Sequence, residues 1–193
     1  MWNIDLTYRE KLQPTFDRLY EKKAVLHEAR PLPKIALQKI QEALSVEWTY
    51  NSNSIEGNTL TLQETQLVLQ EGITIKGKSL REHFEAKNHE LALNHLYTLI
   101  KPDYALDAKD ILDLHRYVLR SIEEDYAGRL RSGGVRISGA NFIPPNARKV
   151  SGLLDELIQF VLENPLQLND IELATIFHHK FVWIHPFFDG NGR

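Results

Sequence analysis

The chain has 193 residues, of which 42% are hydrophobic and 25% are charged, and its formal net charge is -3. These values are typical of a globular protein and argue against direct nucleic-acid binding, which requires a basic surface. No stretch is long and apolar enough to predict a membrane span, no secretory signal opens the sequence, and the lack of cysteine excludes disulfides and thiolate catalysis. We therefore expect a cytoplasmic protein with a well-packed core.

A first helix is predicted over about residues 34–57, soon after Pro31. Large apolar side chains recur there at helical spacing, namely Leu37, Ile40, Leu44, Trp48 and Ile55. Gly57 is a typical helix stop, and it leaves Glu56 at a helix end where the backbone dipole favours cations. Ser52 lies one turn earlier on the same face. A carboxylate in such a position is most often solvated surface.

The next helices are predicted over residues 61–71 and 79–100, with weaker patterns. A sharper pattern begins at Asp107 and Asp110 and continues through Ile111, Leu114, Val118, Leu119 and Ile122. A further helix is indicated by Val150, Leu153, Leu154, Leu157, Val161 and Leu162, and it ends before Asn164-Pro165. The predicted fold is therefore mostly helical.

Residues 133–145 differ from the rest of the chain. Short β-prone runs flank a Ser-Gly-Ala-Asn sequence, and two prolines follow. This arrangement predicts a β-hairpin, which on its own is most simply a surface feature. The fold class is thus all-α with one hairpin.

The last predicted helix runs from Ile171 to Ile184. Asn169 and Glu172 have the spacing of an N-terminal capping box, and apolar residues then point in every direction, which is typical of a helix buried on most sides. Pro186 disfavours helical geometry in the residue before it, so His185 is expected at the last helical position, at the edge of the core. The adjacent His178 and His179 lack the spacing of a zinc site.

The nine residues after this helix combine several chemical groups. Phe187 is expected to anchor the loop in the core, while Asp189 is free to bind a cation. Gly190 and Gly192 allow the backbone to approach a ligand and to form an anion site, to which Arg193 adds donors for phosphate oxygens. Taken singly, these features have simpler explanations, because Asp-Gly and Asn-Gly are common in turns and a terminal histidine often only balances the helix dipole.

Read as one string, residues 185–193 (HPFFDGNGR) resemble the signature of the Fic family, His-Pro-Phe-x-Asp/Glu-Gly-Asn-Gly-Arg, followed two residues later by a second arginine. The resemblance implies a protein adenylyltransferase that moves AMP from ATP to a Ser, Thr or Tyr hydroxyl of a target protein and releases pyrophosphate. It makes His185 the general base and Asp189 the Mg²⁺ ligand. A histidine that titrates near neutral pH suits the first role.

The resemblance also assigns the remaining residues of the string. Gly190, Asn191 and Gly192 become the anion hole for the α- and β-phosphates, Arg193 a phosphate clamp, and Phe187 the core anchor. The second arginine of the family would lie beyond Arg193, so the sequence is expected to be truncated at its C-terminus. The implied fold is a Fic-type helical bundle whose hairpin is a flap that covers the nucleotide and adds a strand to the target.

Upstream, the sequence Ser52-x-x-x-Glu56-Gly57 resembles the inhibitory helix of many Fic proteins. In such proteins the glutamate obstructs the γ-phosphate site, so the resemblance implies autoinhibition through Glu56. The expected organisation is an N-terminal helical region over 1–105, which contains the inhibitory helix, and a catalytic core over 106–193.

Other functions stay open at this point. One is a nucleotide-sensing regulatory module with little turnover, and another is the transfer or removal of a different phosphate-containing group, including removal of AMP. The expected partners are a hydroxyl-bearing target protein and a nucleotide, with a homodimer left open.

Overall fold

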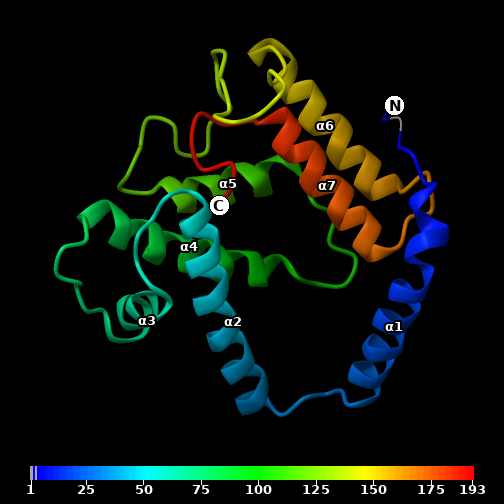
Figure 1. The fold of residues 1–193 in the computed structure, drawn as a ribbon, viewed down its shortest axis with the longest axis horizontal. Coiled ribbons are helices and arrows are strands. Elements are labelled where there is room, and N and C mark those ends of the chain that lie inside the picture. The colour runs from blue at the N-terminus through cyan, green and yellow to red at the C-terminus, as the bar shows by residue number, and fades with distance from the viewer. Residues whose placement is uncertain (1, 3) are drawn as a thin grey trace. The chain divides into compact units, whose positions relative to one another are not determined.

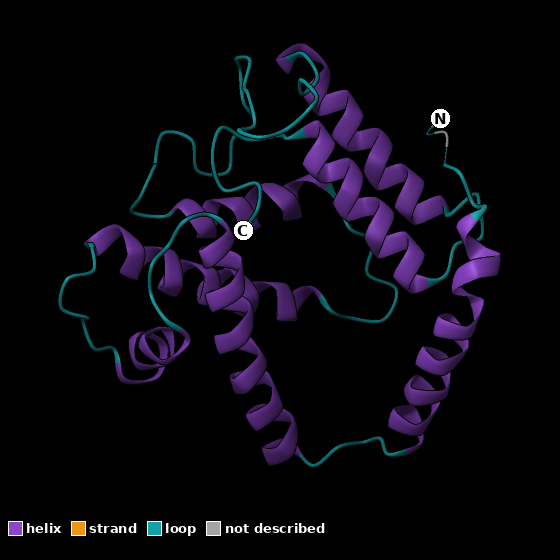
Figure 2. Cartoon of the chain, in the orientation of Figure 1, coloured by secondary structure: helices purple, strands orange, loops and turns teal. Residues whose placement is uncertain are grey.

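The computed structural model describes residue 2 and residues 4–193, and within these residues it contains helices and loops but no strand (Figures 1 and 2). The elements are α1 (Tyr8–Glu28), α2 (Lys34–Ile55), α3 (Leu62–Gln66), the π-helical η1 (Leu67–Glu71), α4 (Leu80–Leu99), α5 (Ala108–Leu119), α6 (Ala147–Glu163) and α7 (Asp170–Ile184). The all-α prediction is therefore confirmed. No helix in the described part of the chain combines the length and the apolar character needed to cross a bilayer.

The chain divides into two compact units, one up to Ala43 and one from Leu44 to Arg193. Helix α1 belongs to the first unit, and α2 begins in the first and ends in the second. The division predicted between residues 105 and 106 separates functional regions and not compact units, and it stays a prediction. Every residue of the candidate site lies in the second unit.

Side-chain caps set the starts of the helices in the second unit. The capping box predicted at Asn169 is present, with its side chain accepting from the N–H of Glu172, and a second box forms at Asp107, whose side chain accepts from the N–H of Asp110. Further boxes form at Thr61 and Ser79. Each box satisfies two backbone donors that a helix start would otherwise leave unpaired, which explains why these helices begin where they do.

Helices α4 and α5 pack side by side, as do α6 and α7 (Figure 1). One core cluster joins the first pair and consists of Ala92, Val118, Leu119 and Ala127. A second cluster joins α5 and α6 to the segment after α7 and consists of Ile111, Leu154, Ile158 and Phe187. The segment after α7 is thus built into the core through Phe187.

Helix α7 is less covered than its sequence predicts. Only Glu172 and Ile184 are buried along its length, so the prediction that it is buried on most sides is wrong. One face packs on α6, and Phe177 and Phe181 are only partly buried, because they contact the cluster around Phe187 but also line a cavity of about 300 Å³. Apolar residues around a whole helix show that it can be buried, whereas the burial itself depends on neighbours.

The hairpin predicted over residues 133–145 is not present as paired strands. Within the described loop 132–146, the only backbone hydrogen bond is a turn, in which the N–H of Ala140 donates to the carbonyl of Ile137 over 3.2 Å. The loop is glycine-rich at one end, and at the other Pro144 and Pro145 have no N–H to donate. Because an isolated two-stranded ribbon is marginal in water, the turn forms without its ladder.

Candidate active site

His185 ends helix α7 in a left-handed conformation, with φ 49° and ψ 63°, and its N–H donates to the carbonyl of Phe181 over 2.9 Å. The sequence placed it at the last helical position, but Pro186 excludes that conformation and the residue becomes the C-cap instead. A left-handed non-glycine residue stores backbone strain, which concentrates at functional sites. This geometry turns the chain out of the helix directly into the motif.

The imidazole of His185 is half-buried, and burial lowers its pKa below the ordinary value of 6.5. The backbone of Val182 opposes this lowering, and the positive charge of Arg131 adds to it. Its Nδ1 atom is buried and has no hydrogen-bond partner among the described residues. The ring is therefore neutral at neutral pH and can accept a proton.

Asn191 closes the loop after His185 with its side chain. Its Oδ1 accepts from the N–H of Phe187 over 3.0 Å, and its Nδ2 donates to the carbonyl of Phe187 over 2.9 Å. The sequence assigned only the backbone of Asn191 to ligand binding and missed this closure. An amide that offers a donor and an acceptor to one peptide unit fixes the loop as a backbone pair would.

A buried histidine supports the same loop from α5. The ring of His115 stacks on Phe187 with 3.6 Å between centroids and 3° between planes, and its Nε2 donates to the carbonyl of Asp189 over 3.0 Å. The N–H of Gly128 donates to its Nδ1 over 2.9 Å, which requires that nitrogen to be unprotonated. Burial lowers the pKa of His115 to about 4, so the ring is neutral at neutral pH.

The glycine turn leaves backbone donors free. Gly190 has φ 75°, and a Cβ there would lie 3.4 Å from the ring of His115, so both conformation and space favour glycine. The N–H groups of Asn191 and Gly192 donate no hydrogen bond within residues 2 and 4–193. Unpaired successive N–H groups on a turn are suited to an anion.

Two arginines hold the carboxylate of Asp189. Arg81 donates from Nη2 over 2.9 Å and Arg193 over 3.1 Å, and the Asp189 side chain is 34% exposed. The side chain of Arg193 is itself 2% exposed and also pairs with Glu85 over 2.8 Å. The sequence predicted Asp189 and Arg193 but not Arg81 or Glu85, because an i,i+4 pair on a helix gives no sign of what it faces.

The donor set around Asp189 fits a magnesium ion only in part. The described residues contain no group of three or more ligand side chains that would hold a metal by themselves. Magnesium commonly takes one or two carboxylates and completes its shell with water and substrate phosphates. Asp189 can supply the protein's share of such a shell, provided that phosphates are present.

The end of helix α2 lies against the glycine turn, and Figure 1 shows the cyan end of this helix beside the red end of the chain. The hydroxyl of Ser52 lies 3.5 Å from the carbonyl oxygens of Gly192 and Arg193. A Cβ on Gly192 would overlap Oε1 of Glu56. Gly57 follows with φ 92°, as expected for a glycine that stops a helix. The structure therefore brings Ser52 and Glu56 to the predicted phosphate loop.

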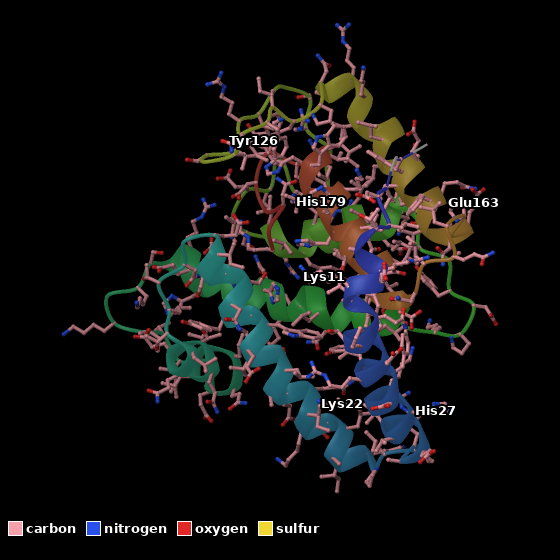
Figure 3. The ribbon with its side chains drawn as sticks, turned by 45° about the vertical axis from the view of Figure 1, so that its right-hand side comes forward. Lys11, Lys22, His27, Tyr126, Glu163 and His179 are labelled. Carbon is pink, nitrogen blue, oxygen red and sulfur yellow. The ribbon has the colours of Figure 1, made fainter. Side chains whose placement is uncertain are left out.

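Two aromatic rings lie at the outer side of the motif. Phe188 is 37% exposed, and the ring of Tyr126, labelled in Figure 3, packs against it at 60° with 5.1 Å between centroids.

His178 and His179 of α7 are exposed and belong to no metal-binding group in the described part of the chain.

Residues 105–193 match the Fic/DOC family. The chain is 31% identical over 192 residues to a protein named Protein adenylyltransferase Fic from Drosophila grimshawi, a match that covers 99% of this chain and 38% of that protein. It is 37% identical over 161 residues to Protein adenylyltransferase fic-1 from Caenorhabditis elegans, which covers 82% of this chain and 31% of that protein. The chain thus spans well under half the length of these curated relatives.

Solved structures agree with these matches. A structure of Fic-1 (residues 134–508) from C. elegans superposes with a TM-score of 0.75 at 32% identity and covers 97% of this chain and 58% of that one. A Fic domain containing signaling protein from Bacteroides thetaiotaomicron superposes with a TM-score of 0.80 at 29% identity, covering 92% and 67%.

Proposed function

Because the chain belongs to the Fic/DOC family, we propose that it transfers AMP from ATP to a Ser, Thr or Tyr hydroxyl of a target protein and releases pyrophosphate. One observation carries the proposal. A half-buried imidazole with a lowered pKa, that of His185, precedes by a few residues a glycine turn whose N–H groups are unpaired. The first group can take a proton, and the second can hold phosphate oxygens.

In the proposed reaction, His185 is the general base. The hydroxyl oxygen of the target attacks the α-phosphorus of ATP while the imidazole takes the hydroxyl proton. The bond to the bridging oxygen breaks, and pyrophosphate leaves with that electron pair. A neutral ring is required at the start, and burial of His185 favours the neutral form.

The loop after His185 would hold the phosphates. The N–H groups of Asn191 and Gly192 meet the phosphate oxygens, and Arg193 turns from Asp189 towards them. Fixed donors of this kind stabilise charge that grows on oxygen as the transition state forms. Asp189 would hold the Mg²⁺, which neutralises phosphate charge when bound. The closure by the Asn191 side chain keeps these donors aligned before the nucleotide arrives.

Glu56 would act as an inhibitor at the same loop. Its carboxylate lies against Gly192, so a negative charge sits where phosphate oxygens are to bind. Ser52 and Gly57 fix the end of the helix that carries it. Removal of Glu56 from this position is the expected step of activation.

The loop 132–146 would receive the target protein. Its backbone groups are largely unpaired, and an extended segment of a target could complete the ladder that the loop lacks. We assign this role to the flap and the catalytic role to the region 106–193 that contains it. The cytoplasmic location and the homodimer stay predictions.

The deciding experiment follows the label of ATP. The chain, and any longer natural chain that contains it, is incubated with Mg²⁺ and either α-³²P or γ-³²P ATP. Transfer of α-label to protein, lost on His185→Ala, is the expected result. Label from the γ-position alone would indicate a kinase, and tight ATP binding without any transfer would favour the nucleotide-sensing module instead.

A further inference from the structure

Arg131 carries a buried charge with no ion pair. The residue is 2% exposed, and no carboxylate lies within ion-pair distance of its guanidinium among the described residues. Burial lowers its pKa, but an arginine remains charged at neutral pH. An unpaired buried charge is costly unless its donors are satisfied in another way, so the partners of Arg131 are informative.

Some of these partners are the last carbonyl groups of helix α7. The Nε of Arg131 donates to the carbonyl of His185 over 2.7 Å and an Nη2 proton to that of Ile184 over 3.3 Å. Its backbone N–H donates to the carbonyl of Pro186 over 2.9 Å. One residue therefore binds three consecutive carbonyls, and it places a cation at a helix C-terminus, where the dipole favours it.

The other partners are the two ends of the loop 132–146. Nη1 of Arg131 donates to the carbonyl of Gly133 over 2.9 Å, and Nη2 donates to that of Pro145 over 2.5 Å. The same planar group thus ties both ends of this loop to the backbone of His185. Lysine offers one ammonium without the planar fork, so it cannot reproduce this set of contacts.

We propose that Arg131 is a positioning residue that holds the imidazole of His185 in register with the loop 132–146, where the target hydroxyl is to arrive. This inference rests on the proposed adenylyl transfer. His185 is left-handed and therefore strained, so its direction depends on what holds its backbone, and Arg131 binds its carbonyl directly. Nucleotide binding is separate, because Asn191 and His115 hold the phosphate loop.

The test compares Arg131→Lys and Arg131→Gln with Arg148→Gln, an exposed arginine at the start of α6. In folded Arg131 variants, we expect kcat for α-label transfer to fall about 100-fold, the effect of a small displacement of a reacting group. The KM for ATP should change less than about twofold. The loss of kcat should be as large in Arg131→Lys as in Arg131→Gln. In Arg131→Ala, added guanidinium should restore kcat in part. Arg148→Gln should resemble the unsubstituted chain.

Two readouts do not require catalysis. Trypsin cleavage after Arg136, inside the loop, should become about tenfold faster in the Arg131 variants, and the ring resonances of His185 should shift in NMR spectra. If the unsubstituted chain transfers no label, the proposed function fails while these readouts still test Arg131. Unchanged cleavage and resonances in folded variants would overturn the inference. Failure of every Arg131 variant to fold would also overturn the inference, because Arg131 would then be required for folding and not for the position of His185.

Discussion

Between Phe187 and Arg193 the chain is fixed by its own side chains, whereas between residues 132 and 146 it is fixed mainly at its two ends. In the first segment, the side chain of Asn191 bonds the backbone of Phe187, and His115 of α5 bonds the carbonyl of Asp189. In the second, a single turn is the only internal backbone bond in the described loop, and Ile143 is 73% exposed. Phosphates have one shape, which a preformed loop can match. A loop with unpaired backbone groups suits the proposed target segment, because pairing between backbones does not depend on the side chains of that segment.

The two segments therefore differ in what disturbs them. The phosphate loop depends on partly buried polar contacts, and removal of one partner leaves the other partner without a hydrogen bond. The flap has few contacts to lose. Changes in the first should affect stability and nucleotide binding, and changes in the second should affect only the target.

Acid should produce the largest effect. Burial lowers the pKa of His115 from 6.5 to about 4, and it does the same for His89, a buried residue of α4 that bonds the hydroxyl of Thr49 in α2. Between those values the unfolded chain binds more protons than the folded one, so stability is complete above about pH 6.5 and is lost as pH falls towards 4. The loss is on the order of 2–3 kcal/mol for each ring. Chemical denaturation between pH 7 and pH 4 measures it.

His115→Gln isolates the share of His115, because the amide can still donate and accept without titrating. We expect the variant to be less stable at pH 7 but to lose less of its stability on acidification. An equal pH dependence in both proteins would contradict the neutral, buried His115 described above.

Asn191→Ala should produce the next largest effect. It removes both bonds to Phe187, each with a net value of about 1 kcal/mol, and frees the loop. We expect ATP affinity to fall about 30-fold, as measured by calorimetry. Asn141→Ala in the flap is the matched control, since Asn141 is exposed, and it should leave ATP affinity unchanged. Similar effects of the two substitutions would remove the distinction between the segments.

Glu56→Gln should change activity by about tenfold, and in the opposite direction. It keeps the shape of the side chain but removes the charge that lies against Gly192. A tenfold gain corresponds to about 1.4 kcal/mol, a reasonable value for one partly exposed charge near phosphates. The measurement is the rate of α-label transfer. Glu47→Gln, on the exposed face of α2, should leave the rate unchanged, and an equal gain there would argue against a specific role of Glu56.

The sequence anticipated those features that depend on local rules. The cap at Asn169 follows from residue spacing, as does the helix stop at Gly57 with its positive φ. The motif also named the residues that meet at the end of α7. Site residues that are adjacent in the sequence, as in 185–193, can be predicted from the sequence alone.

Features made by distant contacts could not be anticipated. His115 and Arg131 gave no signal, because a lone histidine in a helix and a lone arginine in a loop show nothing of the carbonyls they meet. The left-handed His185 was missed since Pro186 excludes one conformation without choosing among the others. The absent ladder of residues 133–145 has the same origin, as strand propensity becomes a strand only when a partner is in place.

The smallest effect should come from Gly139→Ala in the flap. Gly139 has φ 77° and open space around it, so alanine meets no clash but strains the turn by about 1 kcal/mol. The flap contributes little to the fold, so the melting temperature and the KM for ATP should stay the same, while the KM for the target rises about threefold. Gly134→Ala is the control, because its position is equally open and its φ is not positive. If Gly139→Ala instead lowered the melting temperature or weakened ATP binding, the flap would share the rigidity of the phosphate loop, and the contrast between a preformed nucleotide site and an adaptable target site would be lost.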